Sequence, residues 1–84
     1  MFYAYVLFSP TTNKIYIGYT SRNPEERLFA HNNIEKGSFT SKFKPWVLLF
    51  WEVFDTKAEA LGREKQLKSA AGRRFIREFI SNQN

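Results

Sequence analysis

The stretch KIYIGYTSRNPEER, residues 14–27, changes its pattern halfway along. In its first half isoleucines alternate with a tyrosine, and such a period of two is typical of a β-strand. The second half has a natural helix N-cap at Asn23, followed by a proline and, three residues after the cap, by Glu26. These residues in this order are start signals of an α-helix. We therefore predict a strand over residues 14–19 and a helix from about residue 24 to residue 33.

The segments on either side of this stretch add two more strands. Residues 2–8, FYAYVLF, are aromatic and β-branched, and the turn residues that follow predict a β-hairpin with the second strand. Residues 34–45 are predicted to form a basic loop. Residues 46–54, WVLLFWEVF, are apolar on both faces, which predicts a strand that is covered from both sides. In strict alternation, one of these faces would carry Trp46, Leu48, Phe50 and Phe54.

Two further helices are predicted after the third strand. Thr56 and Glu59 form a second capping box, which predicts the start of a helix. This helix should run to about residue 70, because Gly72 would prevent it from continuing. Apolar residues at helical spacing then predict a short final helix; they are Phe75, Ile76, Phe79 and Ile80. The predicted fold is α+β, with a three-stranded, mainly antiparallel sheet flanked by helices in the order ββαβαα. We expect a single domain spanning residues 1–84.

Charge and composition narrow the class of partner. The chain has a formal net charge of +5, from 13 basic and 8 acidic side chains. A domain this basic is typical of a protein with a polyanionic partner such as nucleic acid. The absence of cysteine excludes disulfides and thiolate metal sites. Because no apolar run has membrane-spanning length and the first residues do not resemble a signal peptide, we predict a cytoplasmic protein with no membrane partner.

Glu64 differs from the other carboxylates in its position. At about 100° per residue, Glu64 falls in the same sector of its helix as Ala60, Leu61 and Leu67, which form the apolar stripe. Burying an unpaired carboxylate costs several kcal/mol. Glu64 should therefore have a partner, which is a cation, a hydrogen-bond donor or a bound metal ion. The structural interpretation is an ion pair with an arginine at the edge of the core.

Four more side chains are candidates for chemistry. Arg27 and His31 are four residues apart and share one face of the first helix. A hairpin that turns around residues 10–13 places Tyr5 near Tyr16. Each of these residues alone has an ordinary structural explanation. Together with a carboxylate they provide what phosphodiester hydrolysis needs, namely a base for water, a cation beside the developing charge and a ligand for a metal ion.

This ordered set of residues resembles the GIY-YIG nuclease family. Tyr16-Ile17-Gly18 is similar to the second half of the family signature, and Tyr3-Ala4-Tyr5 takes the place of the first half with only its tyrosine retained. His31-Asn32 stands where many members have the same pair. The resemblance covers about residues 3–69 and is closest to small, single-domain, excinuclease-C-like members.

Two further positions complete the resemblance and define the roles that it implies. Arg27 matches the family's helix arginine, and Glu64 matches its metal-binding glutamate within EALGREKQLK, residues 59–68. The family implies a metal-dependent endonuclease that acts on DNA in repair, recombination or processing. In that scheme Tyr5 is the general base for water. Tyr16 places water or phosphate and can alternate with Tyr5 in the base role.

The resemblance implies roles for four more residues. Arg27 would stabilise the charged phosphate, and His31 would relay a proton or contact the phosphate. Glu64 would hold one divalent cation, which we expect to be Mg²⁺. Gly18 would let backbone or substrate approach closely.

Basic residues in the loop and in the C-terminal third are the predicted nucleic-acid contacts; they are Lys36, Lys42, Lys44, Arg63, Lys65, Lys68, Arg73 and Arg74. The same residues would equally serve a nucleic-acid-binding module that does not cut. A third interpretation is a protein-interaction domain in which Phe39, Phe43 and Trp46 form an exposed aromatic patch. Cleavage assays on branched, flapped and linear DNA, with Mg²⁺ or with chelator, separate these three functions.

Overall fold

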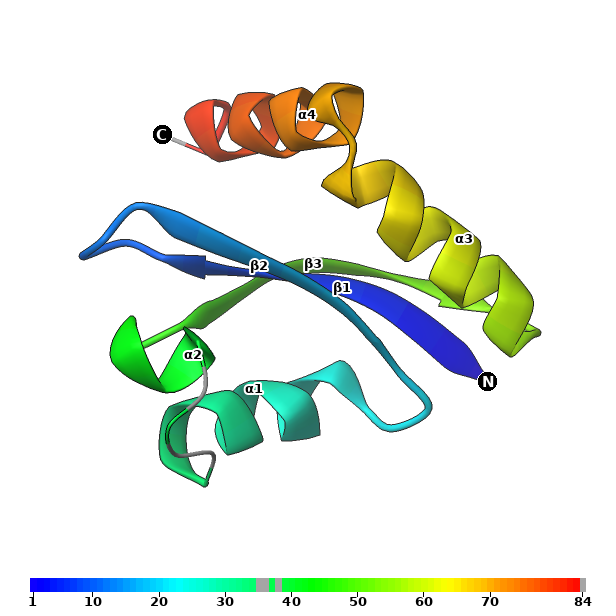
Figure 1. Ribbon diagram of the computed structural model, residues 1–84, viewed down its shortest axis with the longest axis horizontal. Helices are drawn as coiled ribbons and strands as arrows, with labels where there is room; N and C mark the ends of the chain where they lie inside the picture. The colour runs from blue at the N-terminus through cyan, green and yellow to red at the C-terminus, as the bar shows by residue number, and fades with distance from the viewer. Residues whose placement is uncertain (35–36, 38, 84) are drawn as a thin grey trace.

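The computed structural model describes residues 1–34, 37 and 39–83, and it shows one antiparallel sheet with helices on both faces (Figure 1). The strands are β1 (Phe2–Ser9), β2 (Lys14–Thr20) and β3 (Val47–Phe54), in the order β2-β1-β3. Both β2 and β3 are therefore edge strands. The predicted α+β class and the order ββαβαα are confirmed.

Helices cover the sheet from both sides (Figure 1). One face carries α1 (Pro24–Asn33) and the short α2 (Phe39–Lys42), and the other carries α3 (Lys57–Lys68) and α4 (Ala70–Ser81). The helix α2 lies inside the segment that was predicted to be a loop. None of the helices in the described part of the chain is both long enough and apolar enough to span a membrane.

The hairpin sets the alignment of the two signature tyrosines. Asn13 adopts the left-handed conformation, with a φ of 60°, and its backbone N–H donates to the carbonyl of Ser9 at 2.7 Å. Asparagine tolerates this conformation better than most residues. The resulting register pairs Tyr5 with Gly18 and Leu7 with Tyr16. Tyr5 and Tyr16 are thus diagonal neighbours on the face covered by α1.

The sheet buries a separate apolar cluster on each face. Ala4, Val6 and Ile17 pack beneath α3 and α4, together with Leu67 and Ile76. On the other face, the buried members are Tyr5, Leu7 and Trp46, with Leu28 of α1 packed against them. The second cluster therefore contains one of the candidate catalytic tyrosines in its interior.

A bulge in β3 changes the predicted facing of its side chains. The register with β1 shifts between Val6, which pairs with Phe50, and Leu7, which pairs with Leu48. As a result Leu48 packs on the α1 side, whereas Leu49 and Phe50 both pack on the α3 and α4 side. Strict alternation was wrong here, because one extra residue in a bulged strand reverses the facing beyond it.

The break between α3 and α4 falls at Ser69 and not at Gly72. The Ser69 side chain caps α4 by accepting from the backbone N–H of Gly72 at 3.1 Å, and its hydroxyl donates to the carbonyl of Gln66 at 2.6 Å. A Cβ at Gly72 would collide with the backbone of Gln66 and Leu67. Gly72 is therefore needed for close packing at the helix junction, and it does not end α3.

Candidate active site

Three buried side chains form a hydrogen-bonded chain beneath α1. Tyr5 Oη lies 3.0 Å from His31 Nε2, and His31 Nδ1 lies 2.9 Å from Thr40 Oγ1. Tyr5 and His31 are each only 1% exposed, and Thr40 is 2% exposed. In a neutral imidazole one ring nitrogen donates and the other accepts, so the chain can run in either direction. This arrangement can accept a proton at Tyr5 or pass one away from it inside the protein.

Gly18 makes room for the phenol at the start of this chain. A Cβ at position 18 would lie 2.8 Å from Tyr5 Oη and 3.0 Å from Tyr16 Cε1. Both distances are shorter than ordinary contacts of about 3.5–4.0 Å. The group that approaches Gly18 closely is therefore the tyrosine of the adjacent strand, where we had predicted backbone or substrate.

Tyr16 lies beside the buried chain and reaches the surface. Its ring centroid is 4.8 Å from that of His31 and 6.2 Å from that of Tyr5. It is half-buried and also lines an open pocket next to the hairpin. The structure thus brings Tyr5, Tyr16 and His31 into one cluster, in which Tyr16 is the more accessible phenol.

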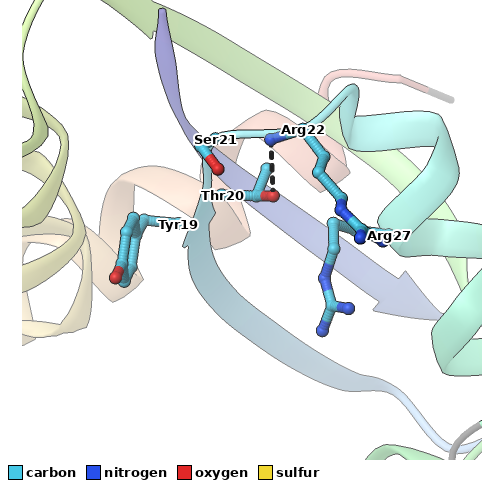
Figure 2. Close-up of a pocket in the computed structure, with 5 residues that line it drawn as sticks. All are labelled: Tyr19, Thr20, Ser21, Arg22 and Arg27. Atoms are coloured by element: carbon cyan, nitrogen blue, oxygen red, sulfur yellow. Dashed lines mark hydrogen bonds between the residues drawn. The ribbon is translucent and has the colours of Figure 1, made fainter.

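Arg27 lines a pocket at the opposite end of β2. This pocket, of about 320 Å³, is formed by Tyr19, Thr20, Ser21, Arg22 and Arg27. Thr20 Oγ1 accepts from the backbone N–H of Arg22 at 3.0 Å and so fixes the turn that leads into α1. Figure 2 shows the side chains of Arg22 and Arg27 extending the same way from this turn and from α1. Two guanidinium groups therefore face one site, which suits a phosphate.

Glu64 lies on α3, which runs along β2 on the other face of the sheet. Lys57 Nζ stands 5.7 Å from the ring centroid of Tyr19, and Lys68 shares a pocket with Tyr16 and Ile17. At about 100° per residue, Lys57, Glu64 and Lys68 occupy one sector of about 40°. Glu64 therefore lies along the β2 edge, between the two pockets.

The immediate partner of Glu64 is Lys68. Their side chains approach to 3.8 Å, and the Glu64 side chain is 19% exposed while that of Lys68 is 49% exposed. An ion pair with so exposed a lysine is weak, at about 0–1 kcal/mol. The partner in the structural ion pair is thus an exposed lysine, where an arginine at the edge of the core was expected, and Lys68 does not enclose the carboxylate.

The donor set near Glu64 limits the kind of metal site that is possible. Among the described residues, no three His, Asp or Glu side chains come together as ligands. Mg²⁺ commonly keeps several waters and uses one or two carboxylates together with substrate phosphates. A single, partly accessible carboxylate fits such a hydrated ion. It does not fit a dedicated protein cage.

The predicted nucleic-acid contacts have different surroundings. Exposed members are Lys42, Lys44, Lys65, Lys68, Arg73 and Arg74. Lys36 lies outside the described residues. Arg63 is engaged in a bidentate pair, with Nε 2.7 Å from Glu52 Oε1 and Nη2 3.2 Å from Glu52 Oε2. The hydrogen bond to Glu52 raises the pKa of Arg63, and the guanidinium ties α3 to β3. Its charge is therefore already compensated within the protein.

The predicted aromatic patch is only partly at the surface. Phe39 is 50% exposed, but Trp46 is 2% exposed and its indole N–H donates to the carbonyl of Thr40 at 2.7 Å. Its backbone N–H and carbonyl are also bound by the side chain of Asn32, at 2.7 and 3.0 Å. The protein-interaction interpretation is therefore wrong in placing Trp46 at the surface, because the indole is buried with its N–H satisfied by Thr40.

Sequence reasoning did not single out Arg22 or Thr40 as site residues. Arg22 follows the signature strand and precedes a capped helix, so its place beside Arg27 was accessible from spacing alone. Thr40 lies in a segment predicted to be loop, and only the fold shows that it reaches His31. No local pattern in the sequence marks it.

Comparisons with known proteins place the chain in a family. The chain matches the GIY-YIG catalytic domain over residues 1–76. It is similar to UPF0213 proteins of Staphylococcus saprophyticus, 40% identical over 55 residues, and of Staphylococcus haemolyticus, 39% identical over 57 residues. The first match covers 66% of each chain and the second covers 68% of each.

A third relative is matched over a longer segment of this chain. A UPF0213 protein of Natronomonas pharaonis is 39% identical over 67 residues, which cover 80% of this chain and 76% of the relative. No solved structure matches the chain significantly. The family match covers both signature tyrosines, the α1 residues and the α3 glutamate. The chain therefore belongs to the GIY-YIG family of nuclease-type domains.

Proposed function

We propose that this protein is a metal-dependent endonuclease that hydrolyses phosphodiester bonds of DNA. The observation that supports this best is the convergence of candidate groups along β2 from both faces of the sheet. Tyr16 and the Tyr5–His31 pair lie on the α1 face, Arg27 lines the pocket at the end of β2, and Glu64 lies on α3. A single strand of nucleic acid at this edge would meet Tyr16, Arg27 and Glu64, with the buried Tyr5–His31 pair behind Tyr16.

The two tyrosines should divide the work of proton transfer. We assign contact with the attacking water to Tyr16, because its phenol is accessible whereas Tyr5 is 1% exposed. Tyr5 and His31 then position the site and accept protons within the buried chain. This modifies the assignment that follows from family resemblance alone, in which Tyr5 is the base. A phenol has an ordinary pKa of about 10, so cleavage should become faster as pH rises through the neutral and alkaline range.

The arginines and a bound cation would stabilise the negative charge that develops on the phosphate. Arg27, with Arg22 beside it, would donate hydrogen bonds to the phosphate as negative charge develops. Glu64 would hold the divalent cation, which we expect to be Mg²⁺. When bound, such a cation neutralises charge on the phosphate oxygens and favours deprotonation of a water ligand.

The decisive test compares Glu64→Gln with Glu26→Gln, which changes an exposed carboxylate on α1. Wild type and both variants are incubated with flapped, branched and linear DNA, in Mg²⁺ and in EDTA. We expect Glu64→Gln to lose cleavage by at least about 10²-fold and to retain binding, and Glu26→Gln to cut normally. A purely structural role for Glu64 predicts the opposite result: unchanged cleavage and a small loss of melting temperature, since the Lys68 pair is weak.

The alternative function is a nucleic-acid-binding module that does not cut. It predicts binding to the same DNA without products under any metal condition. We also propose that residues 1–84 act as a single domain in the cytoplasm, in DNA repair, recombination or processing. Cleavage by the 84-residue chain on its own would directly support the proposal that these residues act as a single domain.

A further inference from the structure

A second basic pocket lies at the hairpin end of β2, next to the junction of α3 and α4. Its volume is about 400 Å³, and its lining includes the cations Lys14, Lys68, Arg73 and Arg77 and the rings of Tyr16 and Phe39. None of its lining residues is acidic. Cations gathered in one concavity repel each other, and an anion bound among them relieves this repulsion. The pocket is therefore suited to a phosphate.

The two arginines of this pocket are already held in place by neutral groups. Arg77 donates from Nη1 to Asn13 Oδ1 at 2.8 Å and from Nη2 to the Asn13 carbonyl at 2.9 Å. Arg73 donates from Nε to the carbonyl of Lys68 at 3.2 Å. Because these partners are uncharged, both guanidinium groups keep their full positive charge. Each has five N–H groups, so other donors remain for a ligand, and a guanidinium that is already fixed loses less entropy on binding.

The pocket is continuous with the candidate active site. Tyr16 lines it directly, and Lys68 pairs with Glu64 at 3.8 Å. The pocket of Arg27 lies at the other end of the same strand. Only Gly18 separates the β2 residues that line the two pockets, and the centres of the pockets are about four residues apart. At about 3.3 Å per residue this offset is ~13 Å, which is a few nucleotides of one DNA strand.

We propose that this hairpin pocket binds a non-scissile phosphate of the DNA strand, a few nucleotides from the phosphate that is cleaved. Lys14 and Arg77 thereby join Lys68 and Arg73 as contacts. This inference rests on the proposed nuclease function, because it takes the strand to run along β2. The contacts fix the register of the strand and carry no sequence information.

Two neighbouring arginines on α4 provide a matched pair of variants. Both side chains are exposed. Arg73 lines the hairpin pocket, whereas Arg74 lines a different pocket together with Glu78. Binding of a fluorescent flapped DNA is measured in EDTA, so that cleavage does not interfere. We expect Arg73→Gln to weaken binding about tenfold and to reduce the slope of log affinity against log salt by about one. Arg74 is itself a predicted nucleic-acid contact but lies outside the hairpin pocket, so Arg74→Gln should weaken binding less than Arg73→Gln does. Equal losses for the two variants would overturn the assignment.

A second experiment identifies the bound phosphate. A methylphosphonate linkage removes the charge of one phosphate at a time along the strand. At one position, this change should weaken binding of the wild type about tenfold and have little further effect in Arg73→Gln, because the partner charge is already gone. Lys14→Gln should couple to the same position. Additive effects at every position would refute the pocket as a phosphate site.

The outcomes also separate this inference from the proposed function. If the wild type cuts in Mg²⁺ but all phosphate positions are additive with Arg73→Gln, the nuclease assignment stands and the pocket assignment falls. If the wild type does not cut but one position couples, the phosphate site stands and the nuclease assignment falls. Absence of any DNA binding would overturn both.

Discussion

Gly18→Ala tests whether the absence of a side chain at Gly18 is needed to accommodate the Tyr5 ring. The added Cβ would lie 2.8 Å from Tyr5 Oη and 2.9 Å from Tyr5 Cζ. A normal contact needs about 3.5–4.0 Å, so the phenol must move by ~0.7 Å. Tyr5 is 1% exposed and bonded to His31 at 3.0 Å, so it has little room to move. Overpacking of this kind costs about 1–3 kcal/mol, and replacing glycine in a strand returns about 0.5–1 kcal/mol.

The net loss of stability should therefore be about 1 kcal/mol, which lowers the melting temperature of a domain this size by ~4–8 °C. Displacement of the phenol should also slow cleavage at least about tenfold, because the Tyr5–His31 hydrogen bond is disturbed. Gly62→Ala is the control. Gly62 lies in α3 with no atom within 4 Å of the added Cβ, so alanine should stabilise the helix by up to about 1 kcal/mol. Urea unfolding and cleavage rates are measured for both. If Gly18→Ala were as stable as Gly62→Ala and cut normally, the space at position 18 would have no role in placing Tyr5.

Three further perturbations concern hydrogen bonds and an ion pair elsewhere in the site and in the elements that support it. Asn32→Ala removes two hydrogen bonds to the backbone at the start of β3 and should lower the free energy of unfolding by about 2–3 kcal/mol; Asn33→Ala, which loses one bond within its own helix, should cost far less in the same urea titration. Thr40→Val removes the hydroxyl next to the buried histidine and should slow cleavage at least about tenfold, whereas Thr40→Ser should restore it; equal rates for the two variants in a pH series would exclude a positioning role. Glu52→Gln breaks the partly exposed ion pair with Arg63 and should lower the free energy of unfolding by about 1 kcal/mol or less. In thermal melts, the difference from wild type should become smaller at high salt.

The fold was largely predictable because local signals and burial requirements agreed. The capping residues Asn23 and Thr56 start α1 and α3 where expected, and the apolar residues of β1 matched a sheet that is covered on both faces. The cover predicted for both faces of β3 is incomplete, since Trp51 is 51% exposed and Val53 is 52% exposed. The errors have specific physical causes. The β3 bulge reverses the facing of its side chains without a mark in the composition. Gly72 was interpreted as a breaker because a glycine needed for close packing resembles one needed for a turn.

The relative positions of the candidate site residues were more predictable than their surroundings. Spacing within the hairpin and along α1 was enough to place Tyr5 near Tyr16 and to put His31 on the adjacent helix. Burial depends on the whole fold, so the sequence did not show that Tyr5 is enclosed while Tyr16 reaches the surface. It also treated Arg63 as a free cation, because its partner Glu52 is on a different element and eleven residues away.

The position of the candidate site at an edge strand follows from the topology. The helix α1 covers one face of the sheet and α3 covers the other, so a side chain of α1 and a side chain of α3 are separated by the sheet itself (Figure 1). The two faces become continuous only at a sheet edge. The order β2-β1-β3 leaves β2 and β3 as the edges, and the signature tyrosine Tyr16 is on β2. Arg27, from α1, and Glu64, from α3, can therefore act on one phosphate only if that phosphate lies against the β2 edge. The two basic pockets lie along the same strand, so an extended chain of phosphates at this edge would reach both of them.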